Sequence, residues 1–228
     1  MALHAIISYD DTQNDHDALM LGRILGDAGA ELTLAYVRHS TDRRADREEL
    51  QLHEAEALLE RGARWLDEPY AGRRVVVSGS TAEGLAWLAS EEQADVIVFG
   101  SDYRTSSGHV AIGRSAQSLL ERGPAAIAIA PSSFHSERRH RIETIGVLPG
   151  SGDEASIETA FSLGERLGAR VADTDRGVGL LVVGSRAEAP EGRVMVSSRS
   201  HNAIEEATSP VLVVARGLPL HFDTLVTV

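Results

Sequence analysis

The stretch from residue 94 to residue 131, ADVIVFGSDYRTSSGHVAIGRSAQSLLERGPAAIAIAP, decides the fold class. An apolar run of strand length ends at Gly100, a polar loop with two more glycines follows, and a helical pattern leads into a second apolar run. Two buried strands joined by a helix predict parallel pairing, because parallel strands need a crossover connection of this kind. The glycine-containing loop that opens the helix also suits an anion, since free backbone amides point out of a helix N-terminus.

The chain before this stretch alternates strand-like and helical patterns. The runs HAIISYD, ELTLAYV and RRVVVSG are strand-like, and apolar residues at helical spacing follow each of them. Ser80 followed by Glu83 is a capping-box pattern at the start of one of these helices. The alternation predicts an α/β fold with a five-stranded parallel sheet, right-handed crossovers and helices on both faces.

The same pattern starts again after a polar and basic segment, SSFHSERRHR, which is typical of a linker. The residues from IETIGVLPGSG to LGARV repeat the first strand, turn, helix and second strand, and GLLVVGSRAEAPEGRVMVSSRSHNAIEEATSPVLVVARG repeats the opening stretch. This internal duplication predicts two domains, at residues 1–133 and 141–217. The second copy is shorter, because VADTDRGVG joins its second strand almost directly to LLVVG.

Composition narrows the classes of protein and partner. The chain has 228 residues, of which 43% are hydrophobic and 25% charged, as in ordinary globular domains. Its formal net charge of -12 opposes nucleic acid and anionic membranes as partners. There is no cysteine, which removes disulfides and thiolate chemistry, and no apolar stretch reaches the roughly 20 residues of a membrane-spanning helix. We therefore expect a cytoplasmic protein.

A ligand site is expected beyond the carboxyl ends of the strands, where the strand order of an open parallel sheet reverses. Three segments of the first copy should meet there: the turn SYDDTQ, the end of the second strand, and the loop from residue 100 to residue 115. The candidate binding residues are Asp10, Asp11, Thr12, Val37, Gly100, Ser101, Arg104, Gly113, Arg114 and Ser115.

The chemistry of these residue types suits a phosphorylated ligand. Gly100 and Gly113 allow backbone to approach a phosphate closely, and Asp10 can accept a hydrogen bond from a ribose or an adenine. Asp10 can equally cap the turn that follows it. Arg104 and Arg114 can reach a phosphate or a neighbouring acid, or remain solvated, and the sequence leaves these alternatives open.

These segments resemble the universal stress protein family, in a tandem arrangement. The resemblance rests on a strand-ending Asp10 followed by a small polar turn, the strand VIVFGS, a glycine that opens a helix, and a last apolar strand. Nucleotide-binding members carry Gly, two residues, Gly, nine residues, then Gly and Ser or Thr. Gly100 matches the first glycine and Gly113 the third, whereas Tyr103 and Arg114 replace the second glycine and the hydroxyl residue.

The resemblance implies two Rossmann-like domains of the adenine nucleotide alpha hydrolase type, the second abbreviated. It further implies a stress-response regulator with ATP or AMP as the ligand of the first domain. In the second copy Ala187 and Ser197 stand at the second and third glycines, and Gly150 stands where the aspartate is expected. The second domain is therefore expected to be a structural partner of the first.

The resemblance also implies an internal pseudo-dimer in which the strands AAIAIAP and PVLVVAR lie at the shared interface. Association of two chains into a homodimer is left open. Two other functions remain: a nucleotide-free interaction or scaffold protein with a degenerate site, and a weak ATP hydrolase. No GxSxG, GxxxxGK[ST] or HExxH pattern occurs, so no catalytic or metal-binding residue is assigned.

Overall fold

The computed structural model describes residues 2–39, 45–67, 71–136 and 141–222, with only the backbone described for residues 45–51. Its strands are β1 (His4–Ser8), β2 (Glu31–His39), β3 (Gly72–Ser78), β4 (Val96–Gly100), β5 (Ala126–Ala130), β6 (Thr144–Leu148), β7 (Arg170–Ala172), β8 (Leu180–Gly184) and β9 (Val211–Val214). The helices are α1 (Asp15–Asp27), α2 (Ala45–Leu66), α3 (Thr81–Glu91), α4 (Arg114–Arg122), α5 (Ala155–Leu167) and α6 (Ser198–Glu205), with a 3-10 helix η1 (Phe134–Ser136) between the halves.

All nine strands form one sheet, in the order β3-β2-β1-β4-β5-β9-β8-β6-β7. Neighbours are parallel everywhere except at β5 and β9, which pair antiparallel around Ala128 and Leu212. The predicted α/β class is confirmed, and so is the meeting of the two last strands. The second half goes from β7 to β8 without an intervening helix, as the short connection VADTDRGVG predicts.

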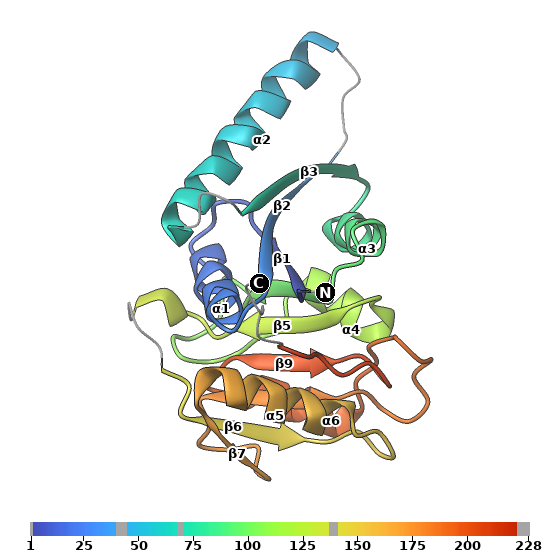
Figure 1. The fold of residues 1–228 in the computed structure, drawn as a ribbon. Coiled ribbons are helices and arrows are strands. Elements are labelled where there is room, and N and C mark those ends of the chain that lie inside the picture. The colour runs from blue at the N-terminus through green and yellow to red at the C-terminus, as the bar shows by residue number, and fades with distance from the viewer. Residues whose placement is uncertain (1, 40–44, 68–70, 137–140, 223–228) are drawn as a thin grey trace, which may run out of the picture.

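Helices cover both faces of the sheet (Figure 1). One buried cluster joins α1, α2 and α5 to one face, and a second joins α3, α4 and α6 to the other. Alternate strand residues supply the two clusters, so that Ile7 faces α1 and Ile6 faces the opposite way. Among the described helices, none is long and apolar enough to cross a membrane.

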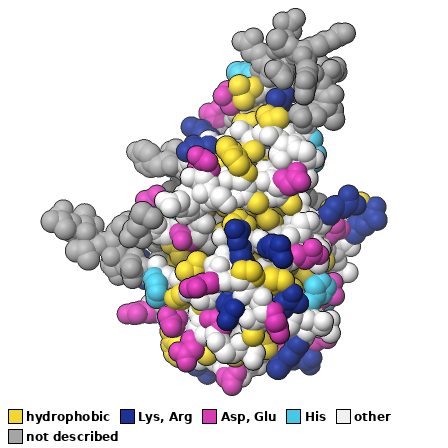
Figure 2. Space-filling view, turned by 90° about the vertical axis from the view of Figure 1, so that its right-hand side faces the viewer, with side chains coloured by type: hydrophobic (Ala, Val, Ile, Leu, Met, Phe, Trp, Pro, Cys, Tyr) yellow, Lys and Arg dark blue, Asp and Glu magenta, His cyan; other side chains and the backbone are white. Residues whose placement is uncertain are grey.

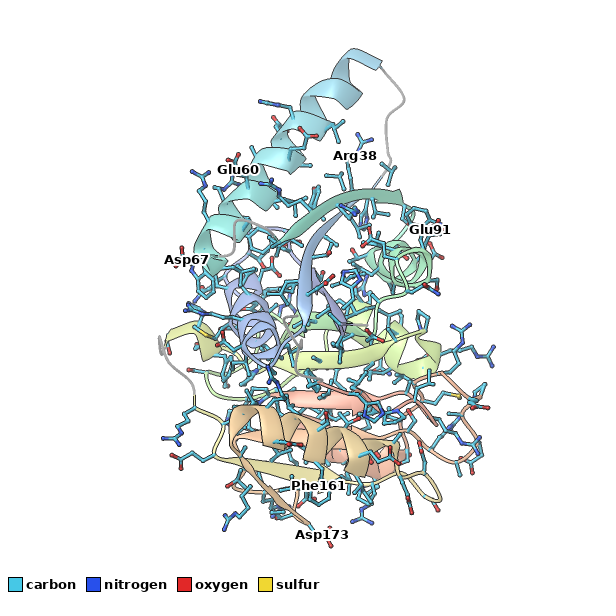
Figure 3. The ribbon with its side chains drawn as sticks, in the orientation of Figure 1. Arg38, Glu60, Asp67, Glu91, Phe161 and Asp173 are labelled. Atoms are coloured by element: carbon cyan, nitrogen blue, oxygen red, sulfur yellow. The ribbon has the colours of Figure 1, made fainter. Side chains whose placement is uncertain are left out.

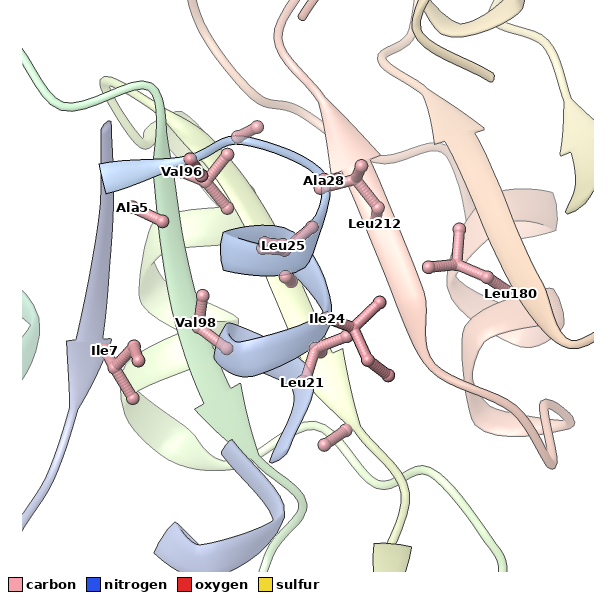
Figure 4. Packing of buried hydrophobic residues seen from close by; sticks show 14 of the residues in the cluster. Ala5, Ile7, Leu21, Ile24, Leu25, Ala28, Val96, Val98, Leu180 and Leu212 are labelled. Carbon is pink, nitrogen blue, oxygen red and sulfur yellow. The ribbon is translucent and has the colours of Figure 1, made fainter. Parts of the chain in front are cut away.

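The first of these clusters runs across the junction of the two halves (Figure 4). Ile24 of α1 and Ala28 directly after α1 belong to the same cluster as Leu212 of β9 and Leu180 of β8. The small alanines of β5, at residues 126, 128 and 130, lie on this face and leave room for α1 to approach the sheet. The two halves therefore share a continuous apolar core on this face.

Hydrogen bonds repeat across the junction with a constant spacing in the sequence. Val110 N donates to Ala207 O at 3.0 Å, and Val194 N donates to Gly123 O at 3.1 Å. Val110 and Val194 are 84 residues apart, as are Gly123 and Ala207, so each bond is the counterpart of the other. The register of β5 and β9 obeys the same spacing, which indicates a local two-fold relation between the halves.

The segment that the sequence presents as a linker is anchored at its start. Asp17 of α1 is fully buried, and its carboxylate accepts hydrogen bonds from Ser133 N at 2.9 Å and His135 N at 2.8 Å. The His135 ring lies with Nδ1 2.6 Å from the same carboxylate. A buried charge is tolerated only when it is paired and hydrogen-bonded, so these contacts hold η1 against α1. Residues 137–140 of the segment lie outside the described residues.

Candidate functional site

The turn after β1 is shaped by Asp15, the first residue of α1. Its Oδ2 accepts hydrogen bonds from Asp10 N and Thr12 N, both at 2.9 Å. Burial first, and then the hydrogen bond and the charge of the neighbouring Asp10 carboxyl, together raise the pKa of Asp15 to about 8. Asp11 takes the left-handed conformation, with φ of 65°, at the tip of this turn. Asp15 therefore satisfies the turn and leaves the Asp10 side chain exposed.

Asp11 is engaged within the protein. Its carboxylate accepts a hydrogen bond from the Tyr9 hydroxyl at 2.7 Å and forms an ion pair with Arg61 of α2, also at 2.7 Å. These two contacts, the Tyr9 hydroxyl first, hold the pKa of Asp11 below its usual range. Burial raises the pKa of the Tyr9 hydroxyl, so it remains a donor. Asp11 thus fastens the turn onto α2, and its contact with a ligand stays a prediction.

A cavity of about 770 Å³ lies at the carboxyl ends of β1 and β2, under the part of α2 that projects beyond the sheet (Figure 1). Asp10 and Val37, both predicted site residues, line it together with Arg38 and Arg61. Arg38 is the penultimate residue of β2, and Figure 3 shows it in the upper part of the view, toward α2. The cavity therefore combines two exposed carboxylates, those of Asp10 and Glu54, with two guanidinium groups and an apolar floor.

Gly100 and Ser101 serve the packing of the turn. A Cβ at Gly100 would collide with the carbonyl oxygen of Asn14, and Asn14 Nδ2 donates to Ser101 O at 2.7 Å. Ser101 is buried, and its hydroxyl donates to Ala130 O at 2.7 Å and accepts from Ala111 N at 3.1 Å. Glycine is required at position 100 because the turn after β1 lies directly against it.

The start of α4 is different, because it is open. Gly113 is the N-cap residue, has no side chain to cap the helix, and has empty space where a Cβ would stand. The amide end of the helix and its positive dipole end are therefore accessible to an anion. Arg114 at this helix start is exposed, and the Ser115 side chain is half-buried.

Tyr103 does not close this loop. Its side chain is 71% exposed, and the Arg104 guanidinium lies over its ring at 5.0 Å from the centroid. Of the predicted residues, only Asp10 and Val37 line the 770 Å³ cavity, and Arg104, Gly113, Arg114 and Ser115 lie outside it. The candidate site thus has two parts, the cavity beside β1 and β2 and the helix start of α4.

The equivalent positions of the second half are closed. Ser197, 84 residues after Gly113, caps α6 by accepting a hydrogen bond from Ser200 N at 3.1 Å. Asp153 Oδ1 accepts from Ala155 N at the start of α5, and its Oδ2 accepts from Gly217 N. Both helix starts of the second half therefore have internal acceptors, in contrast to α4.

Sequence reasoning missed Asn14, Asp15 and Arg61. For Asp15 alone there was a usable signal, because a helical pattern starts at this residue, five positions after Asp10. The packing of Asn14 on Gly100 and of Arg61 on Asp11 joins residues 86 and 50 positions apart. Within the described residues, no group of three His, Asp or Glu side chains could hold a metal ion.

Comparisons with known proteins identify the family. The universal stress protein family model matches residues 3–131, which is more than half of the chain. Among solved structures, the chain is similar to a universal stress protein from Archaeoglobus fulgidus, with a TM-score of 0.70 and 13% identity over 94% of this chain and 98% of that one. A functionally unknown protein from Pseudomonas aeruginosa has a TM-score of 0.60 and 10% identity over 94% and 93%.

These two likenesses concern the fold, since both identities are low. A comparison with curated proteins returned no match. The family match covers the residues that carry the resemblance in the sequence, from the turn after β1 to the end of β5. The chain belongs to the universal stress protein family.

Proposed function

We propose that the protein is a stress-response regulator that binds one adenine nucleotide, ATP or AMP, in its first half. The adenosine would enter the cavity at Asp10 and Val37, and the phosphates would meet the start of α4. The observation that carries this proposal is the contrast between Gly113 and Ser197. The first half keeps an uncapped helix start together with an exposed carboxylate, and the second half keeps neither.

The chemistry of the proposed complex follows from these groups. The Asp10 carboxylate would accept hydrogen bonds from ribose hydroxyls or from the adenine amino group. The open amides at Gly113 would donate to phosphate oxygens, a favourable interaction at a helix N-terminus. The side chains of Arg104 and Arg114 are exposed, and both residues are close to Gly113 in the sequence. They can add charge-assisted hydrogen bonds to the phosphates. The bound nucleotide would then change which partner the regulator binds.

The proposed architecture is two domains, residues 1–133 and 141–217, that act as an internal pseudo-dimer. The antiparallel pairing of β5 with β9 and the matched hydrogen bonds of Val110 and Val194 support it. A nucleotide in the first domain lies beside α4, and α4 packs in the same buried cluster as α6. A shape change at α4 could thereby reach the second domain.

The test compares two matched variants, Gly113→Asp and Ser197→Asp. Asp is a favourable N-cap residue, so neither variant should lower the stability of the free protein. In the wild-type protein, millimolar ATP or AMP should raise the melting temperature. Gly113→Asp should abolish that rise, because a carboxylate then occupies the phosphate position, and Ser197→Asp should retain it. No rise in the wild-type protein with either nucleotide would refute the proposal.

A second candidate function is a nucleotide-free interaction or scaffold protein. Two contacts favour this function. Gly100 leaves room for the Asn14 carbonyl, and Asp11 forms an ion pair with Arg61, so these two predicted site residues contact the protein itself. Mass spectrometry of ligands that co-purify with the protein separates the two candidates. A weak ATP hydrolase would require multi-turnover release of phosphate, which should depend on Gly113 if it occurs at this site.

A further inference from the structure

We propose that a second cavity, between α4 and α6, binds a small phosphorylated ligand. This inter-helix cavity has a volume of about 750 Å³ and is lined by residues of both halves. It lies on the face of the sheet that carries α3, α4 and α6. Figure 2 shows basic and acidic side chains intermixed on the side of the molecule that is on the right in Figure 1. Neither Asp10 nor Gly113 lines it, so it is separate from the proposed nucleotide site.

Two arginines from different halves supply the positive charge of the inter-helix cavity. Arg122 comes from the end of α4 and Arg186 from the loop after β8, and Glu121 is the one acidic residue of the lining. In the described part of the chain, neither guanidinium forms an ion pair; Arg186 meets only the Met195 sulfur, at 4.0 Å. Both side chains are exposed and ready to bind an anion.

The two-fold relation of the halves provides an internal comparison. The residues 84 positions away from Arg186 and Arg122 are Asp102 and Glu206, so acids occupy the positions related to these two arginines. Similar backbone surroundings therefore carry opposite charge on the two sides of the junction. In a chain with a net charge of -12, this local concentration of arginine is not a consequence of composition.

The lining defines the class of ligand. Every basic residue in the chain other than histidine is an arginine, and arginine binds phosphate through two parallel hydrogen bonds. Ser198 and Asn202 add side-chain donors, whereas Leu120 and Met195 add apolar surface. A phosphate or pyrophosphate group attached to a small organic body matches this mixture. Free inorganic phosphate and pyrophosphate share the same recognition chemistry.

Isothermal titration calorimetry at low ionic strength tests the proposal, with inorganic pyrophosphate and ribose 5-phosphate as separate probes. We expect saturable binding at one site per chain. Arg186→Gln and Arg122→Gln should each weaken it about tenfold or more, the usual loss for a charge-assisted hydrogen bond. Glu121→Gln should strengthen binding, because it removes the only carboxylate of the lining. Tighter binding of ribose 5-phosphate than of pyrophosphate would identify an organic ligand, and the reverse would identify a free oxyanion.

Two control variants separate the inter-helix cavity from the rest of the protein surface. Arg199→Gln removes an exposed arginine from α6 that does not line the cavity, and it should leave binding unchanged. Gly113→Asp blocks the phosphate position of the proposed nucleotide site and should also leave pyrophosphate binding at the inter-helix cavity unchanged, so failure of that site is distinguishable from failure of this one. The proposal is overturned if pyrophosphate does not bind at millimolar concentration, or if Arg199→Gln weakens binding as much as Arg186→Gln does.

Discussion

Replacement of Asp17 by alanine should destabilise the protein far more than replacement of an exposed aspartate on the same helix. The carboxylate is fully buried and receives three hydrogen bonds, from Ser133 N, His135 N and the His135 ring. Asp17→Ala removes all three and leaves two backbone N–H groups at Ser133 and His135 without their acceptor. The variant therefore tests whether this contact anchors the segment between the halves.

The magnitude follows from the bonds that are lost. A hydrogen bond to a charged group contributes about 1.5–3 kcal/mol, and an abandoned donor has a further desolvation cost. Because His135 is partly exposed, water can replace the acceptor on one side, so we expect a loss of about 3–5 kcal/mol. For a chain of this size that corresponds to a fall of about 10 °C in melting temperature. Asp17→Asn keeps an oxygen acceptor and should lose about half as much.

Urea denaturation monitored by circular dichroism gives the free energy of unfolding for each variant. Asp27→Ala, on the same helix but exposed, is the matched control and should change stability by less than about 0.5 kcal/mol. If Asp17→Ala proves no more destabilising than Asp27→Ala, the buried carboxylate does not anchor η1, and the reasoning from burial and hydrogen bonding fails.

Two further predictions concern the turn after β1. Gly100→Ala should destabilise the protein by about 1–3 kcal/mol, since the added Cβ collides with the Asn14 carbonyl, whereas Gly113→Ala meets open space and should be neutral; equal thermal stability of the two variants would contradict the packing argument. The pKa of Asp15 is raised from 3.8 to about 8, so the folded protein holds this proton more tightly than the unfolded chain does. The stability that results is full below about pH 4 and is lost as the pH rises through about 8. Asp15→Asn should remove about 4 kcal/mol of this pH dependence between pH 5 and pH 9, measured by urea denaturation, and an unchanged pH profile would exclude Asp15 as its source.

The strands and the duplication were predictable because short apolar runs and their repetition are local features of the sequence. Apolar runs such as VIVFG and AIAIA favour buried strands at that length, and their recurrence as LLVVG and VLVV identifies the second copy. The pairing of β5 with β9 followed from placing the last strand of each copy at a shared interface, as the family resemblance implied. Regular periodicity and repetition thus predicted most of the fold.

The side-chain contacts of the site were not predictable from such patterns. Gly100 suggested close approach of a phosphate, whereas the structure shows that its missing Cβ makes room for the Asn14 carbonyl. Asp11 suggested a ligand contact, whereas Arg61, 50 residues later, takes its charge. A sequence gives the type of each side chain but not the neighbour that tertiary packing brings to it. Gly100 and Asp11 could therefore be recognised as important, but their contacts could not be predicted.

The proposed function requires that one adenine nucleotide binds in the first half of the chain and none in the second. Native mass spectrometry of the protein mixed with AMP or ATP measures this stoichiometry directly. We expect one nucleotide per chain, retained in Ser197→Asp and lost in Gly113→Asp. No bound nucleotide, two per chain, or one per chain that survives Gly113→Asp would contradict the proposal.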